Sequence, residues 1–435
     1  MMTVSSRCSA LTLFLLLSLF ANGQTPPAVP AQLTLAQAEQ LAVRNNPQIS
    51  ISKLGALAEA QVTRQVRSAE LPNASGNLTA VLPHAGSRIA AGGLNNPLIL
   101  ERAAGGVTVS QLITDFGRTP ILVQSARYHA RAADAAQIAT SQDIRFAVDD
   151  AFYRALSAQA LVRVAEETVN ARQTTTDQVS ALTNAKLKSD LDLSFANVNL
   201  AQAKLLLLDA QNGAAESLAT LNTLLGFENA PAYTLVETIA PPPALPTEPE
   251  AALVRQALRS RPDLLALDDQ FRAAQSFARS EHELYRPTLS GLAAFGGTPV
   301  RGSSPLTPWY GAAGINLNIP IFNGFQYSAR ANEADYRRDQ ASEQVRDLRN
   351  RIAHDVRVTL LNLQAASQRT IVTAQLLQEA NTALDLATTR YKLGLSSIVE
   401  LSQAQLQQTQ AAIGNTNARY DYQSASAALG FQLGQ

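Results

Sequence analysis

The stretch "AVRNNPQI" at positions 42–49 returns as "ALRSRPDL" at positions 257–264, which is 215 residues later. Matching residues continue along the chain at this spacing and then at a spacing of 208. Identical pairs include Arg64/Arg279, Pro72/Pro287, Val148/Val356 and Gly226/Gly434. An ungapped match of this length indicates a duplication whose halves share one tertiary plan, and the change in spacing predicts a loop of unequal length between about 77 and 106.

The bulk composition and the N-terminus narrow the class of protein. Hydrophobic residues make up 46% of the chain, charged residues make up 16%, and the formal net charge is zero, so nothing attracts nucleic acid. Arg7, an apolar run and then small residues predict a secretory signal peptide over 1–23, and the only cysteine, Cys8, lies inside it. No later stretch offers the ~20 uninterrupted apolar residues of a membrane-spanning helix, so strands would have to make any membrane crossing.

Alternating apolar and polar residues predict two strands in each repeat. In "INLNIPI" at 315–321, isoleucine or leucine alternates with asparagine or proline, which is the period of a strand. Each pair of strands flanks a loop rich in glycine and proline, so each repeat should form a β-hairpin. The strands are expected at about 72–82, 105–114, 287–296 and 309–321.

Two stretches without internal helix breakers predict very long helices, at about 119–184 and about 327–392. A helix of this length would be about 100 Å long, which is too long for a globular core. In the second stretch, residues that are mostly apolar recur every seven positions, as Val356, Leu363, Thr370, Leu377 and Leu384. This spacing predicts a coiled-coil seam between helices that pack side by side.

Each long helix is expected to end at a hairpin tip, from which a second helix returns to Gly226 or Gly434. The tips are predicted at about 184–192 and about 393–400. A strip with many prolines then separates the two repeats and should lie outside any helix bundle. The predicted plan is a first repeat at 24–226, an external linker at 227–250 and a second repeat at 251–435.

Four strands from one chain cannot close a transmembrane barrel, since the smallest such barrels use eight and open edges are not tolerated in lipid. A dimer would supply eight strands and a trimer twelve, and only the larger barrel leaves an open bore. Aromatic residues around the strand ends suit the girdles where a barrel meets lipid headgroups. They are Tyr285, Trp309, Tyr310 and Phe322. The predicted fold class is therefore mostly α with a transmembrane β part.

Several motifs carry a resemblance to one known family. They are "LTLAQAEQLAVRNNPQI" (33–49), "ITDFGR" (113–118), "RSRPDLLAL" (259–267), "PIFNGF" (320–325) and the tip "RYKLGLSSIVELSQAQ" (390–405) with its weaker twin "KLKSDLDLSFANVNLAQA" (186–203). In their order and spacing the chain resembles the TolC-like outer membrane efflux proteins over practically its whole mature length.

The resemblance implies a homotrimer with a twelve-stranded barrel in the outer membrane, continued by an α-helical barrel through the periplasm. It further implies an exit duct of a tripartite efflux or type I secretion system, which works with a periplasmic adaptor and an inner-membrane pump. The cargo stays open among drugs, metal ions and polypeptides, and so does the pump family.

The resemblance also assigns roles to residues at the tips. Glu400 takes the place of the first carboxylate of a pore-constricting acidic ring, and Gln403 replaces the second. Tyr391 matches a tyrosine that ties neighbouring hairpins shut, with Asp192 as its acidic counterpart, but a serine stands where the family has an arginine. Glu400 and Asp192 can also be read as helix N-terminal carboxylates that interact with the helix dipole. The residues expected to meet the adaptor are Leu187, Lys188, Ser189, Gly394, Leu395, Ser396 and Ser397.

The sequence predicts no enzyme, no metal site and no cofactor. "DFG" at 115–117 lacks the other motifs of kinases and reads better as a turn from strand to helix. The four histidines have no metal-ligand spacing, and Asp149 and Asp150 are adjacent on a helix, so their side chains diverge. The alternative function is a periplasmic coiled-coil adaptor or structural spacer without membrane strands.

Overall fold

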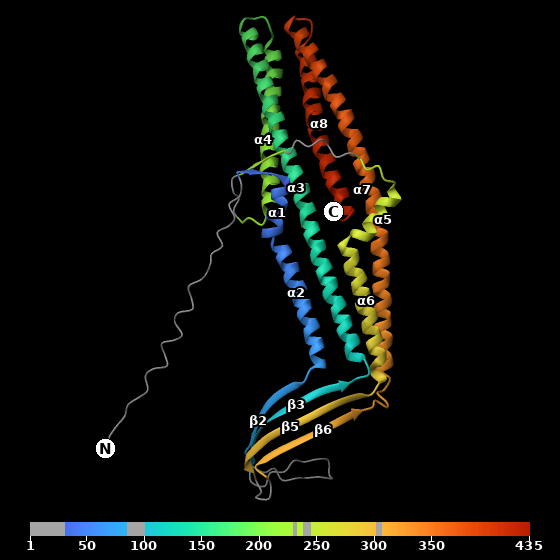
Figure 1. Cartoon of the computed structure of the whole chain (residues 1–435). Helices are drawn as coiled ribbons and strands as arrows, with labels where there is room; N and C mark the ends of the chain where they lie inside the picture. The colour runs from blue at the N-terminus through green and yellow to red at the C-terminus, as the bar shows by residue number, and fades with distance from the viewer. Residues whose placement is uncertain (1–30, 85–100, 229–232, 238–244, 302–306) are drawn as a thin grey trace, which may run out of the picture.

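The computed structural model describes residues 31–84, 101–228, 233–237, 245–301 and 307–435. The predicted signal peptide lies outside these residues. The molecule is elongated, with a four-stranded sheet at one end and the tips of two helical hairpins at the other (Figure 1). Within the described ranges, no helix combines the length and the apolar character needed to cross a membrane.

Helices of equal length occupy equivalent places in the two repeats. The first repeat has α1 (Leu35–Asn45), α2 (Pro47–Arg67), α3 (Arg118–Asn184) and α4 (Asp190–Leu224). The second has α5 (Glu250–Ser260), α6 (Pro262–His282), α7 (Gln326–Lys392) and α8 (Ile398–Gln432). Each long helix, α3 or α7, has 67 residues and each returning helix has 35, so the duplication seen in the sequence extends to the architecture.

The four main strands form one antiparallel sheet with the order β2-β3-β5-β6. They are β2 (Asn73–Val81), β3 (Arg102–Thr114), β5 (Thr288–Arg301) and β6 (Trp309–Asn318). The last strand ends before the predicted 321, because Pro320 has no N–H to donate to a ladder. Each repeat supplies one hairpin, β3 joins β5 across the repeats, and β2 and β6 are left as edges.

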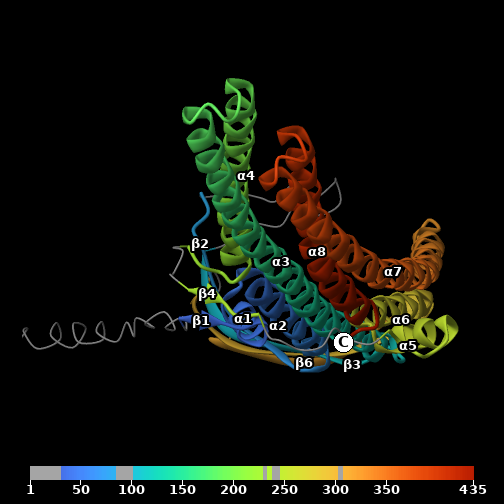
Figure 2. The ribbon, with the colours of Figure 1, turned by 90° about the horizontal axis from the view of Figure 1, so that it is seen from above.

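The helices form a curved row of columns beside one another (Figure 2). α3 packs against α2 and α4 on one side and against α6 and α8 on the other, while α7 packs against α6 and α8. One column is α4 continued by α2, and another is α8 continued by α6. The α4/α2 column and α7 therefore stand at the two ends of the row.

The repeated stretch, at 42–49 and again at 257–264, lies at the joint where the broken columns are stacked. Asn46 caps α2 by accepting from the Gln48 backbone N–H at 2.9 Å, and its Nδ2 donates to the carbonyl of Leu224 at the end of α4 at 2.8 Å. In the second repeat the Ser260 hydroxyl donates to the Leu433 carbonyl at 2.6 Å. In each repeat, the repeated stretch therefore lies at the break between the first two helices and donates a hydrogen bond to the end of the returning helix. The last carbonyls of that helix have no partner within it.

Tight turns lead from the sheet into each long helix. In the first repeat Phe116 and Gly117 have positive φ values, 56° and 104°, and in the second Gly324 and Phe325 have values of 61° and 67°. The Asp115 carboxylate accepts from the backbone N–H of Gly117 at 3.3 Å and from that of Thr119 at 2.7 Å. The "DFG" triplet is thus part of a capped turn between β3 and α3.

A buried carboxylate ties three helices together next to these turns. Glu281, near the end of α6, is 1% exposed. It accepts from Arg330 of α7 with Nε–Oε2 at 2.7 Å and from Arg118 at the start of α3 with Nη2–Oε1 at 3.4 Å. The cluster joins both repeats at the level where the rods meet the sheet.

The linker between the repeats is less detached than its proline content suggests. Its residues Thr234–Leu235 form the short strand β4, which pairs in parallel with β1 (Gln32–Leu33). Leu33 and Leu235 are buried in a core with Leu221 and Phe152. A few apolar residues therefore fasten part of the predicted external linker to the first repeat.

Candidate functional site

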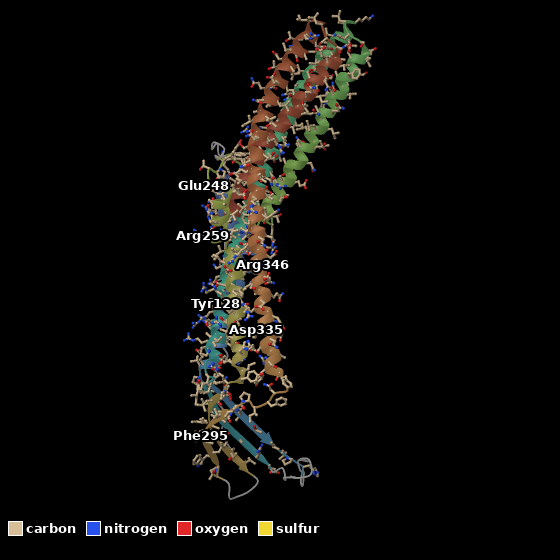
Figure 3. The ribbon with its side chains drawn as sticks, turned by 90° about the vertical axis from the view of Figure 1, so that its right-hand side faces the viewer. Tyr128, Glu248, Arg259, Phe295, Asp335 and Arg346 are labelled. Carbon is tan, nitrogen blue, oxygen red and sulfur yellow. The ribbon has the colours of Figure 1, made fainter. Side chains whose placement is uncertain are left out.

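The two faces of the sheet differ in polarity. Directly paired residues lie on one face, so the register places apolar side chains of all four strands together. Large members of this apolar face are Leu78, Val107, Phe295, Ile315 and Leu317, all of them exposed (Figure 3 labels Phe295). The opposite face carries Asn77, Thr108, Ser290, Asn316 and Asn318. An exposed apolar sheet face of this extent is typical of a surface that lies against lipid or another protein.

Aromatic side chains gather at both ends of β6, whose ten residues span about 30 Å. Near the helices, Tyr285 packs edge-on against Tyr327 with ring centroids 5.6 Å apart, and Phe322 packs against Phe325 at 5.7 Å. At the far end, Trp309 lies 6.3 Å from Phe295 on the apolar face.

Tyr310 differs from the other predicted interface aromatics. Its neighbour Trp309 is on the apolar face, and adjacent strand residues point to opposite faces, so Tyr310 lies on the polar face. Its ring covers Gly106 and Gly296, where an added Cβ would come within 2.3 and 2.5 Å of the tyrosine hydroxyl. Tyr310 therefore covers a glycine patch in the sheet and does not extend the apolar surface.

The two hairpin tips are built on one pattern. Each long helix ends with a residue of positive φ, Lys186 at 59° in the first repeat and Gly394 at 75° in the second. The next backbone N–H, of Leu187 or Leu395, reaches back five residues at 2.8 Å, as in a Schellman turn. The first tip is the weaker sequence match because a lysine occupies the position that favours glycine.

The acidic residues at the tips occupy equivalent helix-capping positions. Ser189 caps α4, and Asp192 returns the contact by accepting from the Ser189 backbone N–H at 3.2 Å. Ser397 caps α8 and accepts from the Glu400 backbone N–H at 3.3 Å. Asp192 and Glu400 therefore both lie in the first turn of a returning helix, where a carboxylate interacts favourably with the helix dipole.

Glu400 is paired within its own hairpin. Its Oε1 lies 3.1 Å from Nε of Arg390 near the end of α7, and both side chains are about half exposed. Gln403 is exposed on α8, one turn further along. Arg390 was not singled out from the sequence, because its contact with Glu400 depends on how the chain turns between them.

The tips of the two hairpins contact each other through a small core. Val179 of α3 and Ala196 of α4 pack with Tyr391, Ile398 and Leu401 of the second hairpin. Asn199 adds a hydrogen bond to the Ser402 hydroxyl at 2.7 Å. The two hairpins of one chain are therefore held side by side close to their ends.

Tyr391 is the residue on which both tips converge. It is 7% exposed, and Nζ of Lys188 lies 4.4 Å from the centre of its ring. Its hydroxyl is buried without a hydrogen-bond partner in the described part of the chain, and so is the hydroxyl of Ser396. Burial first, and then the nearby Asp192 carboxylate, raises the pKa of Tyr391. The structure brings Tyr391, Asp192 and Lys188 together where the two tips meet.

The remaining predicted tip residues are arranged around these contacts. The side chains of Leu187 and Leu395 are exposed at 70% and 66%, and Leu393 beside them is exposed at 68%. No group of three or more histidine, cysteine, aspartate or glutamate side chains within the described ranges is placed to hold a metal ion. The tips thus offer apolar and charged contacts to another protein or to a solute, with no metal centre among the described residues.

Comparisons with known proteins identify the class that the sheet and the paired rods define. The family model for outer membrane efflux proteins matches residues 31–227 and 253–435. The outer membrane protein TolC of Vibrio cholerae is 27% identical over 317 residues, which is 69% of this chain and 70% of TolC. The pyoverdine export outer membrane protein OpmQ of Pseudomonas aeruginosa is 27% identical over 192 residues, which is 44% of this chain and 40% of OpmQ.

The fold also resembles that of solved structures. The crystal structure of CusC, a protein described as forming a transmembrane channel, superposes with a TM-score of 0.80 at 18% identity and covers 92% of each chain. The class is that of long-helix proteins which carry a small antiparallel sheet at one end. The chain belongs to the outer membrane efflux protein family, and it is a protein of the outer membrane.

Proposed function

We propose that three copies of the chain form a continuous exit duct, in which twelve strands make a barrel in the outer membrane and the rods make a helical tube in the periplasm. The observation that carries the proposal is the sheet, with one exposed apolar face, one polar face and two unpaired edges, β2 and β6. Unpaired edges cannot be left in lipid, and joining β6 of one copy to β2 of the next removes them.

The ends of the helical row support the same closure. Large exposed apolar side chains concentrate on the columns at the two ends, whereas α3 in the middle exposes Ile138 alone. On one end they include Leu54 and Leu57 of α2 and Phe195, Val198 and Leu205 of α4, and on the other Leu361, Ile371, Val372 and Leu376 of α7. Two different surfaces that meet head to tail generate a ring. Twelve strands leave a bore, whereas the eight of a dimer would be filled by side chains.

The test is the assembly of the mature chain purified in detergent. Cross-linking is expected to yield three chains per particle, and reconstitution into planar bilayers should give an ionic conductance. A stable, detergent-free monomer would contradict the duct and support the alternative of a periplasmic adaptor or spacer, which needs no apolar sheet face.

The tips serve as the gate of the duct and as the docking site for a periplasmic adaptor of an efflux or secretion system. The exposed leucines around Leu187 and Leu395 supply apolar contact for the adaptor. Around a threefold axis, three copies of Glu400 create a negative potential that favours cations, moderated by Arg390. Gln403 adds no second ring of charge.

Neutralising one or the other member of the Glu400–Arg390 pair should shift ion selectivity in opposite directions. Glu400→Gln removes the carboxylate and leaves Arg390 unpaired, so cation preference should fall, whereas Arg390→Gln leaves Glu400 unpaired and should raise it. Both side chains are about half exposed, so each change should alter stability by at most about 1 kcal/mol. The measurement is the reversal potential under a salt gradient. Equal reversal potentials in wild type and both variants would leave Glu400 with its helix-end role alone.

Removing the lysine above Tyr391 should loosen the closed tips. Lys188→Met keeps an apolar stem but loses a cation–π contact worth about 1 kcal/mol at a partly exposed site, so the fraction of time spent conducting should increase about fivefold. Single-channel recording measures this fraction. Lys186→Met is the control, since Lys186 is exposed at the same tip without such a contact. Identical gating in the two variants would remove Lys188 from the gate.

A further inference from the structure

A cavity of about 850 Å³ lies at mid-height of the rods, where α1, α3, α7 and α8 come together near the linker. Its walls include four aromatic rings, Phe152 and Tyr153 from α3 and Tyr420 and Tyr422 from α8. Leu156 and Ile371 add apolar surface. Cavities of this size accommodate drug-sized molecules.

The charged side chains that line the cavity differ in whether they form an ion pair. Glu237 lies 3.4 Å from Nη2 of Arg419 and accepts a hydrogen bond from Tyr420. Glu39 of α1 forms no ion pair with any lysine or arginine of the described chain. The cavity therefore has one neutralised ion pair and one carboxylate without a cation.

A second carboxyl group stands next to Glu39. Asp149 of α3 shares a hydrogen bond with Glu39, and its Oδ1 is buried without any donor in the described residues. Burial, followed by the charge and hydrogen bond of Glu39, raises the pKa of Asp149 to about 7, while Arg145 acts in the opposite direction. Tyr153 also faces both carboxyl groups. Near neutral pH, this pair thus takes up or releases a proton.

Two arginines of α3 act on this region from outside the cavity lining: Arg145 lowers the pKa of Asp149, and Arg163 acts on Tyr420 in the same direction. α8 contributes Arg419, which is held by Glu237, and the tyrosines 420 and 422. α7 contributes Ser367, Thr370 and Ile371 to the lining, and none of these side chains titrates in the ordinary range. Within the cavity lining Arg419 is the one arginine or lysine and it is paired, so the Glu39 carboxylate presents negative charge to a space that aromatic rings also line.

We propose that this cavity binds an amphiphilic organic cation, with its charged centre against Glu39 and its apolar body among the rings of Phe152, Tyr153 and Tyr420. The carboxylate provides the charge that a cation needs in a partly desolvated site, and the rings provide both apolar area and cation–π attraction. An organic anion of the same size is disfavoured, because Glu39 and Asp149 repel it and Arg419 is already paired. The site is separate from the tips, so it does not depend on the proposed gate.

Binding is coupled to the proton of Asp149. Below pH 7 this carboxyl group is protonated, and above it the pair carries a second negative charge. The cation should therefore bind about tenfold more tightly at pH 8 than at pH 6, and binding at pH 7 should release a fraction of a proton.

The experiment uses the full mature chain in detergent and ethidium, a permanently charged amphiphilic cation, with fluorescence anisotropy as the signal and empty micelles as the blank. Glu39→Gln is expected to weaken binding at pH 8 by about tenfold, whereas Asp149→Asn is expected to abolish the pH dependence. Asp150→Asn is the matched control, since Asp150 is the next residue on α3 but is held by Arg154 at 2.7 Å. The anionic probe 8-anilinonaphthalene sulfonate should not compete.

Two outcomes would overturn the proposal. One is wild-type ethidium affinity in Glu39→Gln, and the other is equal competition by the anionic probe. Proton release by the wild-type protein, measured in weakly buffered solution at pH 7 on addition of ethidium, gives a test that does not depend on the variant folding. Binding without any proton release would rule out the carboxyl pair as the anchor.

Discussion

Replacing Glu281 by glutamine is expected to lower the free energy of unfolding of the helical part by about 3 kcal/mol, because it removes the acidic partner of a buried ion cluster and leaves two arginines behind. Arg118 is the first residue of α3, and Arg330 lies near the start of α7. Their side chains are partly exposed, so they recover some hydration, whereas Glu281 itself is almost inaccessible. The denaturant midpoint, followed by the helical circular dichroism signal of the purified protein in detergent, measures the loss.

A neighbouring carboxylate provides the control. Glu283 pairs with Arg286 three residues further along, and the arginine is half exposed. Glu283→Gln should therefore change the free energy of unfolding by less than about 1 kcal/mol. If both variants unfolded at the wild-type midpoint, the cluster around Glu281 would not be what holds the three helices together beside the sheet.

The change Gly226→Ala is expected to destabilise the first repeat by about 3 kcal/mol, the sum of backbone strain and a steric clash. Gly226 has φ of 77°, and a Cβ there would lie 2.7 Å from the backbone oxygen of Asn45. The clash is with main chain at the joint between α4 and α2, so no flexible side chain can move aside. Thermal unfolding and limited trypsin digestion of the first hairpin should both report the loosened joint.

Gly394→Ala separates the two contributions. Its φ of 75° is nearly the same, but a Cβ at this tip would meet nothing within 4 Å. It should therefore cost only the strain of about 1 kcal/mol. Equal destabilisation by the two substitutions would show that contact at the joint contributes nothing beyond backbone conformation.

The long helices and the strands could be predicted because their signals are local. The absence of glycine and interior proline marks α3 and α7, and the alternation in "INLNIPI" marks β6. The face of the sheet on which Tyr310 lies could also be predicted. Its neighbour Trp309 is an even number of residues from Ile315, so these two side chains share the apolar face. Counting residues along that strand would have placed Tyr310 on the polar face.

The contacts that complete the tips could not be predicted in this way. Ser397 and Glu400 are three residues apart, so their capping relation follows from helix geometry alone. The pairing of Glu400 with Arg390 requires the shape of the turn between them, and the approach of Lys188 to Tyr391 requires the packing of one repeat on the other. One sequence without its fold carries no information on such distant pairs.

Because each repeat pairs an unbroken helix with an interrupted one, alternate columns of the helical row are broken at one height. At the interruption, the end groups of α4 and α2 already lack partners in their own helices, so a change of angle there acts on contacts across the joint, such as the hydrogen bonds from Asn46 to Leu224 and from Ser260 to Leu433. The unbroken α3 and α7 resist stretching and keep the distance from the sheet to the tips constant. The upper parts of the rods lean away from the lower parts near this height (Figure 3). In the proposed duct, tilting the rods about this level would move the tips and leave the sheet undisturbed.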